Sequence, residues 1–310
     1  MKFCYGPVVS RRLGLSLGVD LTSDRYCSFD CVYCQVGATV NKGIKRVKYV
    51  DIYEFIDELK EFAASGQRVD YVTFAGSGEP TLHEDLDWYI RAVRGVLGDQ
   101  VKICVITNSS LLYMKKVRDE LAEADLIIPS LDAASQNIFE KINMPVNGQD
   151  IKRVIKGIVD LRKEFRGEIW LEIMLVKNLN DIEEEFENFK KVINKIKPDK
   201  VQINVPVRPP AKSVKPPAKK KIKQLMAMIG DDVEVICACS AVVMSEHDVI
   251  AAVSSDDVID YVARRPAPIE EIAESFNVSD GQIYEIINKL IFEKTLIRYE
   301  HQGRTYIKCV

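Results

Sequence analysis

Residues 14–34, GLSLGVDLTSDRYCSFDCVYC, join a strand-like run to a loop that holds three cysteines. The run spans residues 15–21, and five more follow at residues 69–74, 101–106, 125–131, 168–176 and 200–205. The segments between these runs carry helical periodicity. Alternating strands and helices predict an α/β fold, with a parallel sheet and helices outside it. Six such units are fewer than the eight of a closed barrel, so we expect a partial (β/α)6 barrel.

The three cysteines of this loop, Cys27, Cys31 and Cys34, have the spacing Cys-x3-Cys-x2-Cys. In a reducing compartment, such a tight cluster is more often metal-binding or catalytic than disulfide-bonded. A 4Fe–4S cluster has four irons and usually takes four cysteines, so three thiolates leave one iron open to a non-protein ligand. A structural zinc site with a distant fourth ligand is the alternative. Zinc motifs favour pairs of close cysteines, and no second pair with x2 spacing accompanies this one.

The triplet, with Tyr33 directly before its last cysteine, resembles the signature of radical S-adenosylmethionine (SAM) enzymes. Residues 6–14 (GPVVSRRLG), 76–82 (GSGEPTL), 130–133 (SLDA) and 207–210 (VRPP) resemble an uncharacterised Fe–S oxidoreductase group within that superfamily, related to archaeal tRNA wyosine (imidazoguanosine) synthases. The resemblance implies a 4Fe–4S cluster on the three cysteines, with SAM bound at the open iron. It also implies reductive cleavage of SAM to methionine and a 5′-deoxyadenosyl radical that takes a hydrogen atom from the substrate.

Candidate SAM ligands follow the C-terminal ends of the predicted strands, where parallel α/β folds place their sites. Gly76, Ser77, Gly78 and Glu79 match the Gly-Gly-Glu-Pro motif of the family, except that Ser77 stands where glycine is often found. Glycines let the backbone approach a ligand closely, so its carbonyls can accept from the SAM ammonium group. An ordinary turn is the alternative. The remaining SAM candidates, for ribose, adenine or backbone contacts, are Tyr33, Asn108, Ser130, Asp132, Asn204, Val205 and Pro206.

Residues 208–223 contain seven basic residues, four prolines and no acidic residue. Two interpretations stay open for them: a stiff, solvated connection into a helix, or a phosphate-facing lip beside the active site. Candidate substrate-binding residues are Arg11, Arg12, Lys177 and Arg208. Surface ion pairs and solvation are the alternatives for these four side chains.

Residues 254–310 predict a small winged-helix-like domain, after a barrel domain at 1–207 and a flanking segment at 208–253. A helical stripe over 269–276 and a second helix that starts at Ser279 are followed by β-rich runs at 295–299 and 305–309. Ser279 with Gln282 forms a capping box, and Thr81 with Glu84 predicts another helix start in the same way. Seven basic and ten acidic residues in this domain argue against sequence-specific DNA binding and favour protein or substrate docking.

Two further features bear on cofactors and location. Cys237 and Cys239 could help to bind an auxiliary cluster, or they could be buried structural thiols. Related wyosine synthases use more cysteines upstream of the triplet, whereas only Cys4 lies there in this chain, which argues against their pyruvate-using ring closure.

No apolar run reaches the ~18 residues of a membrane span, and the start lacks the apolar core of a signal peptide. We therefore expect a cytoplasmic protein.

Three functional hypotheses follow from the sequence. The first is a radical SAM enzyme that modifies RNA or another macromolecule and is reduced by a donor such as ferredoxin or flavodoxin. The second is an activase that installs a glycyl radical on a partner enzyme, because the acidic C-terminal domain suits protein docking. The third is a metal-sensing regulator with a degenerate barrel.

Overall fold

A curved, eight-stranded sheet organises the chain. The computed structural model describes residues 1–310 apart from 23–24, 231–232, 237–252 and 277. From β2 to β10 every neighbouring pair in the sheet is parallel, whereas β1 is antiparallel to β2. In spatial order the strands are β1 (Cys4–Ser10), β2 (Gly14–Val19), β5 (Tyr71–Phe74), β6 (Lys102–Thr107), β7 (Leu126–Pro129), β8 (Glu168–Met174), β9 (Lys200–Asn204) and β10 (Val233–Val235).

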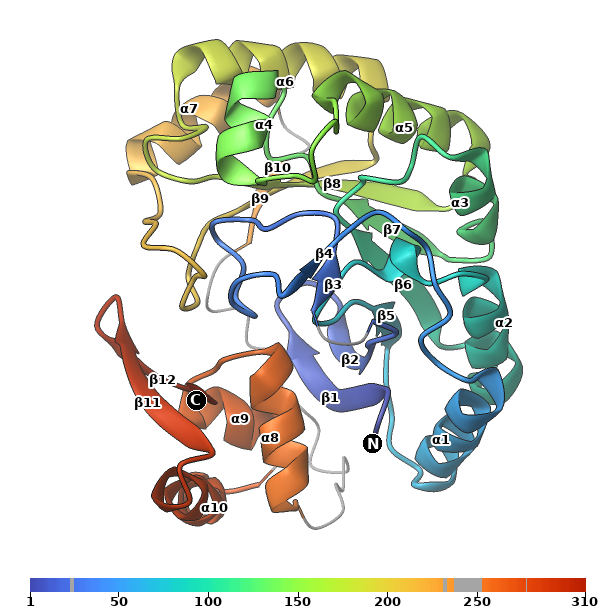
Figure 1. The fold of residues 1–310 in the computed structure, drawn as a ribbon, viewed down its shortest axis with the longest axis vertical. Coiled ribbons are helices and arrows are strands. Elements are labelled where there is room, and N and C mark those ends of the chain that lie inside the picture. Colours follow the sequence, from blue (N-terminus) through green and yellow to red (C-terminus); the bar gives the residue numbers. More distant parts are fainter. Residues whose placement is uncertain (23–24, 231–232, 237–252, 277) are drawn as a thin grey trace.

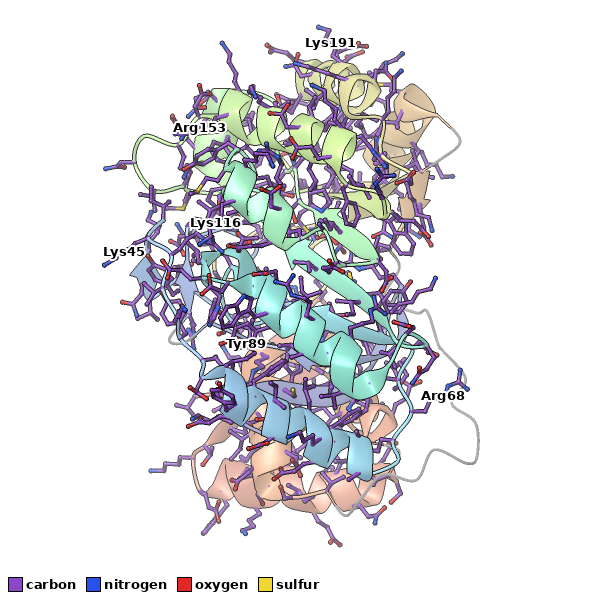
Figure 2. The ribbon with its side chains drawn as sticks, turned by 90° about the vertical axis from the view of Figure 1, so that its right-hand side faces the viewer. Lys45, Arg68, Tyr89, Lys116, Arg153 and Lys191 are labelled. Atoms are coloured by element: carbon purple, nitrogen blue, oxygen red, sulfur yellow. The ribbon has the colours of Figure 1, made fainter. Side chains whose placement is uncertain are left out.

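Helices form an arc on the outer side of this sheet (Figure 1). Their apolar faces, such as Phe55, Leu59 and Phe62 of the first helix, pack into one core with the sheet. The ring centroids of Phe55 and Tyr89, which is labelled in Figure 2, lie 5.2 Å apart between two neighbouring helices. The helices are α1 (Ile52–Ala64), α2 (Leu86–Leu97), α3 (Lys115–Glu120), α4 (Gln136–Ile142), α5 (Ile151–Glu164), α6 (Glu183–Ile196) and α7 (Lys219–Ile229). Among the described residues, no helix is long and apolar enough to cross a bilayer.

The six predicted strands are all present, and the structure adds β1 and β10 at the two edges of the sheet. Pro7 argues against a strand at β1 because proline cannot donate to a ladder. The strand forms nevertheless, since it lies at an edge and its register shifts between Tyr5 and Val8. The sheet is therefore open, with different strands at its margins. This mixed α/β fold with its parallel sheet is consistent with the predicted partial barrel.

The helix start predicted at Thr81 is wrong. Thr81 lies in a short 3-10 helix, η1 (Pro80–Leu82), and α2 begins only at Leu86. The hydroxyl of Thr81 donates to Glu79 at 2.6 Å, so the neighbouring carboxylate takes the group that the capping box required. The other predicted box is confirmed, because Ser279 caps a helix and exchanges hydrogen bonds with Gln282.

The chain after residue 253 forms a C-terminal unit of three helices and a hairpin, which packs beside β1 (Figure 1). Its apolar core includes Tyr261, Ile272 and Ile287, and Val8 of β1 joins the same cluster. The sequence missed the first of its helices. The elements are α8 (Ser255–Arg264), α9 (Ile269–Ser275), α10 (Asp280–Phe292), β11 (Leu296–His301) and β12 (Arg304–Cys309).

Polar contacts attach the C-terminal unit to the edge strand β1 and to the segment that follows β9. On one side, the guanidinium of Arg265 donates to the carbonyl of Val9 at 3.3 Å. On the other side, Tyr306 and Gln302 donate to the carbonyls of Val207 and Pro206, which follow β9. The unit therefore bridges β1 and the segment after β9.

A buried ion-pair group strengthens this attachment. Glu271 of α9 accepts from both Arg208 and Arg265 at 2.5 Å. Burial raises the pKa of Glu271, but the two guanidinium groups outweigh it and lower the pKa to about 2. The charged carboxylate therefore stabilises the folded protein above its ordinary pKa of 4.5, and this stability is lost as the pH falls from there toward 2.

We expect Glu271→Gln to destabilise the protein near pH 6 and to make its thermal stability depend less on pH in the acid range. Removing one partner of a buried ion pair costs about 3–5 kcal/mol, because the remaining charges lack compensation. Thermal unfolding of both proteins between about pH 6 and pH 3 measures this. The wild-type midpoint should fall more steeply than that of the variant, and parallel curves would contradict the assignment.

Candidate active site

The three cysteines of the triplet lie together at the C-terminal end of the sheet. Cys27 ends the short strand β3 (Tyr26–Cys27), and all three line one cavity of about 300 Å³. Backbone hydrogen bonds from Asp30 and Val32 to the end of α4 and the residues directly after it hold this loop in place. Of the predicted residues, the cavity is also lined by Arg11, Arg12, Tyr33, Gly76, Gly78, Glu79, Asn108, Ser130, Asn204, Val205, Pro206 and Arg208.

The three cysteine thiols, together with the side-chain amides that donate to two of them, fit a 4Fe–4S cluster with three protein ligands. Asn108 donates to the sulfur of Cys27 at 3.4 Å, and Asn143 donates to that of Cys31 at 3.3 Å. Burial raises the pKa of Cys27 to about 12, and it also raises the pKa values of Cys31 and Cys34. The thiols are therefore neutral on their own, and binding iron releases their protons.

Among the residues that the structure describes, no group of three His, Cys, Asp or Glu side chains is arranged to hold a single metal ion.

The turn after β5 explains why glycine is needed at two positions and not at Ser77. A Cβ at Gly76 would lie 2.1 Å from the Asp20 carboxyl carbon, and one at Gly78 would lie 2.1 Å from the Tyr26 carbonyl oxygen. The Ser77 side chain points elsewhere, since its hydroxyl donates to the carbonyl of Thr22 at 3.3 Å and Ser77 does not line the cavity. The departure from the family motif thus falls where a side chain has room.

Glu79 holds the ends of β5 and β6 together. Its buried carboxylate accepts four hydrogen bonds: two from Thr81, one from the Thr107 hydroxyl at 2.6 Å and one from the backbone of Asn108 at 2.7 Å. Burial raises the pKa of this carboxyl, and the four donors oppose that rise. Glu79 thereby positions Asn108, which contacts Cys27.

The structure does not bring Asp132 to the cavity, although the sequence predicted it as a ribose ligand. Its carboxylate accepts instead from the Tyr33 hydroxyl, from Asn143 at 2.7 Å and from the backbone of Met174 at 2.9 Å. Burial raises its pKa to about 6. Asp132 therefore connects the cysteine loop to the end of β8. The sequence analysis missed Asn143, because nothing local marks a residue 112 positions from Cys31 as its neighbour.

Two of the predicted substrate residues are committed to ion pairs. Arg12 pairs with Glu172 and donates to Gln202 at 3.0 Å. Arg208 pairs with Glu271, as described above. Lys177 does not line the cysteine cavity and instead faces a separate cleft. Arg11 lies in the turn between β1 and β2 and lines the cysteine cavity.

The other cysteines do not join the triplet in the described part of the chain. Cys4 and Cys104 are buried in β1 and β6, and Cys309 is half-buried in β12. All six described cysteines are free thiols. Cys237 and Cys239, the candidates for an auxiliary cluster, lie outside the described residues.

Comparison with known proteins places this geometry in context. Residues 23–191 match the Radical SAM superfamily. The chain is 31% identical to the UPF0026 protein MJ1312 of Methanocaldococcus jannaschii, over 99% of this chain and 95% of that protein. It is 37% identical to the GTPase Obg of Brachyspira hyodysenteriae over 94% of its own length, but it spans only 42% of that protein. A radical SAM methyltransferase from Sphaerobacter thermophilus has a similar fold, with a TM-score of 0.54 and 17% identity over 71% of this chain and 65% of that one.

Proposed function

Because the chain belongs to the radical SAM superfamily, whose members are enzymes that use a 4Fe–4S cluster and SAM, we propose that it applies this chemistry to a nucleotide of an RNA strand. When bound and reduced, the cluster and SAM supply methionine and a 5′-deoxyadenosyl radical, which takes a hydrogen atom from the substrate. Cys27, Cys31 and Cys34 hold the cluster in this proposal. The SAM-binding groups are Tyr33, Gly76, Gly78, Glu79, Asn108, Ser130, Asn204, Val205 and Pro206.

The observation that carries the RNA proposal is a second cavity, of about 630 Å³. We call it the basic cleft and define it by Lys177, Lys212, Lys215, Tyr299 and His301, which are among its lining residues. In the described part of the chain, no acidic residue lines it. Lysines from the segment after β9 thus face aromatic rings from the hairpin β11–β12.

The chemistry of the basic cleft suits a single-stranded nucleic acid. The rings of Tyr299 and His301 lie 25° from parallel with centroids 6.4 Å apart, and the Lys308 ammonium stands 4.3 Å from the Tyr299 ring. Proteins bind single strands by neutralising phosphates with cations and by stacking bases on aromatic side chains. This supports the interpretation of residues 208–223 as a phosphate-facing lip.

The basic cleft adjoins the cysteine cavity. The backbone of Lys212 donates to Val32 of the cysteine loop at 3.0 Å. Gln302, which lines the cleft, donates to the carbonyl of Pro206, which lines the cysteine cavity. An RNA strand held in the cleft can therefore direct one nucleotide toward SAM.

The C-terminal unit has a distinct role in this proposal. It acts as a winged-helix-like domain over 254–310, whose hairpin supplies the aromatic wall of the basic cleft. Residues 1–207 form the catalytic domain, and 208–253 connect the two. The electron comes from a cytoplasmic donor such as ferredoxin or flavodoxin.

The test compares RNA binding by the anaerobically reconstituted enzyme and a Lys212→Gln/Lys215→Gln variant. We expect affinity for single-stranded RNA to fall at least about 10-fold near physiological salt, with the salt slope reduced by about 1.4, because each lysine on a single strand contributes about 0.7. The matched control is Lys190→Gln/Lys191→Gln on the outer face of α6, where Lys191 projects from the surface (Figure 2). Equal affinity in all three proteins would refute the RNA proposal. A persistent glycyl radical on a partner protein after reaction would instead support the activase.

A further inference from the structure

Three arginines, Arg11, Arg12 and Arg208, line the cysteine cavity, and a fourth, Arg265, lies next to Arg208 because both donate to Glu271. The carboxylates near them are Glu172 and Glu271, so the group carries a net positive charge. We call this group the arginine cluster; its members are Arg11, Arg12, Arg208 and Arg265.

Three members of the arginine cluster have partners. Arg12 is bound by Glu172 and Gln202, as described above. Arg208 donates to the carbonyl of Pro266 at 2.5 Å and shares Glu271 with Arg265. These contacts use both carboxylates of the region.

Arg11 differs from the other three. Its Nη1 is buried, and in the described part of the chain it is the sole buried side-chain nitrogen or oxygen atom with no hydrogen-bond partner. Burial, and then the other arginines, lower its pKa to about 10, so it stays protonated at neutral pH. Arg11 also lines the cysteine cavity. A buried cation without a partner is costly, which points to a ligand that compensates it.

We propose that Arg11 binds a phosphate group of the substrate inside the cysteine cavity. A guanidinium presents paired N–H donors that match the oxygens of a phosphate. The proposal rests on the function proposed above and assigns the phosphate to the reacting nucleotide.

The carboxylate of SAM is the other oxyanion that could reach this cavity, and the topology favours the substrate. Arg11 precedes the N-terminal end of β2, whereas the cysteine loop follows its C-terminal end. Six strand residues span about 20 Å. In the SAM geometry proposed above, the methionine carboxylate lies at the open iron beside the cysteines. The backbone of Arg11 lies at the opposite end of β2, and its side chain extends from there into the cysteine cavity.

The experiment measures thermal unfolding of the reconstituted holoenzyme with and without inorganic phosphate, at constant ionic strength. At about 10 mM phosphate we expect the wild-type midpoint to rise by about 2 °C. Arg11→Gln should lose this response, and Arg11→Lys should keep part of it. Without phosphate, Arg11→Gln should be at least as stable as the wild type, because an uncompensated buried charge is removed. A purely structural arginine would give a less stable variant, and that result would overturn the proposal.

Two controls separate the alternatives. Arg68→Gln alters an exposed arginine at the outer surface (Figure 2) and should respond to phosphate like the wild type. The affinity for SAM is measured in the wild type and in Arg11→Gln as well. A 10-fold loss of SAM affinity would assign Arg11 to the SAM carboxylate and overturn the proposal.

The two proposals can fail separately. If Lys212→Gln/Lys215→Gln binds RNA normally but Arg11 controls the phosphate response, the RNA assignment fails and a smaller phosphorylated substrate is indicated. If RNA binding depends on the basic cleft but phosphate stabilises Arg11→Gln as much as the wild type, the Arg11 proposal fails alone.

Discussion

We expect Cys31→Ala to lose the 4Fe–4S cluster and with it SAM cleavage. Loss of a residue that merely supports a metal ligand costs about 10–100-fold, so loss of a ligand should lower 5′-deoxyadenosine formation more than about 100-fold. Cys31 also receives the amide of Asn143, and alanine removes that acceptor as well. Iron and sulfide analysis, visible absorbance and 5′-deoxyadenosine formation after anaerobic reconstitution measure the effect.

The control for this prediction is Cys104→Ala. Cys104 is buried in β6 and packs with Leu13, Leu126 and Ile128 in a separate apolar cluster. Its loss should lower stability without changing iron content per folded molecule. Full cluster occupancy in Cys31→Ala would disprove the ligand assignment.

Glu79→Gln should damage both stability and SAM cleavage. The Glu79 carboxylate accepts four hydrogen bonds and donates none, and one of its oxygens accepts from the backbone N–H of Asn108. An amide turns one acceptor into a donor, so at least one buried N–H or O–H loses its partner. We expect the free energy of unfolding to fall by about 1–3 kcal/mol.

Urea unfolding and SAM cleavage measured together test this prediction. The effect should reach the cluster, because Asn108 contacts Cys27. Glu123→Gln, at an exposed position, is the matched control and should change neither quantity. A Glu79→Gln variant with normal stability would show that the four hydrogen bonds are unimportant.

The sequence analysis correctly predicted the features that depend on short-range patterns. Six strands, the cysteine loop and the helix start at Ser279 each depend on residues that are close in sequence. The Ser279–Gln282 box succeeded because both partners are exposed and have no competitor. The Thr81–Glu84 box failed because Glu79 captures Thr81 once the turn is buried.

Hydrogen bonds and ion pairs between residues far apart in sequence determine the rest of the site. Asp132 was predicted to face a ligand, but Tyr33, 99 positions away, and Asn143 take its oxygens. Arg12 meets Glu172 across 160 positions, and no spacing rule reveals such a pair. Arg11 and Arg12 are adjacent and chemically alike, so only the fold distinguishes the free arginine from the paired one.

The bridge that the C-terminal unit forms between β1 and the segment after β9 has a consequence for substrate shape. While the unit stays docked, its hydrogen bonds to Val9, Pro206 and Val207 keep these two segments tied together. For the proposed RNA substrate, the approach is then over the loops beside the basic cleft. A base would have to unstack from its neighbours and be inserted, which favours flexible hairpin loops or unpaired ends over rigid double helices.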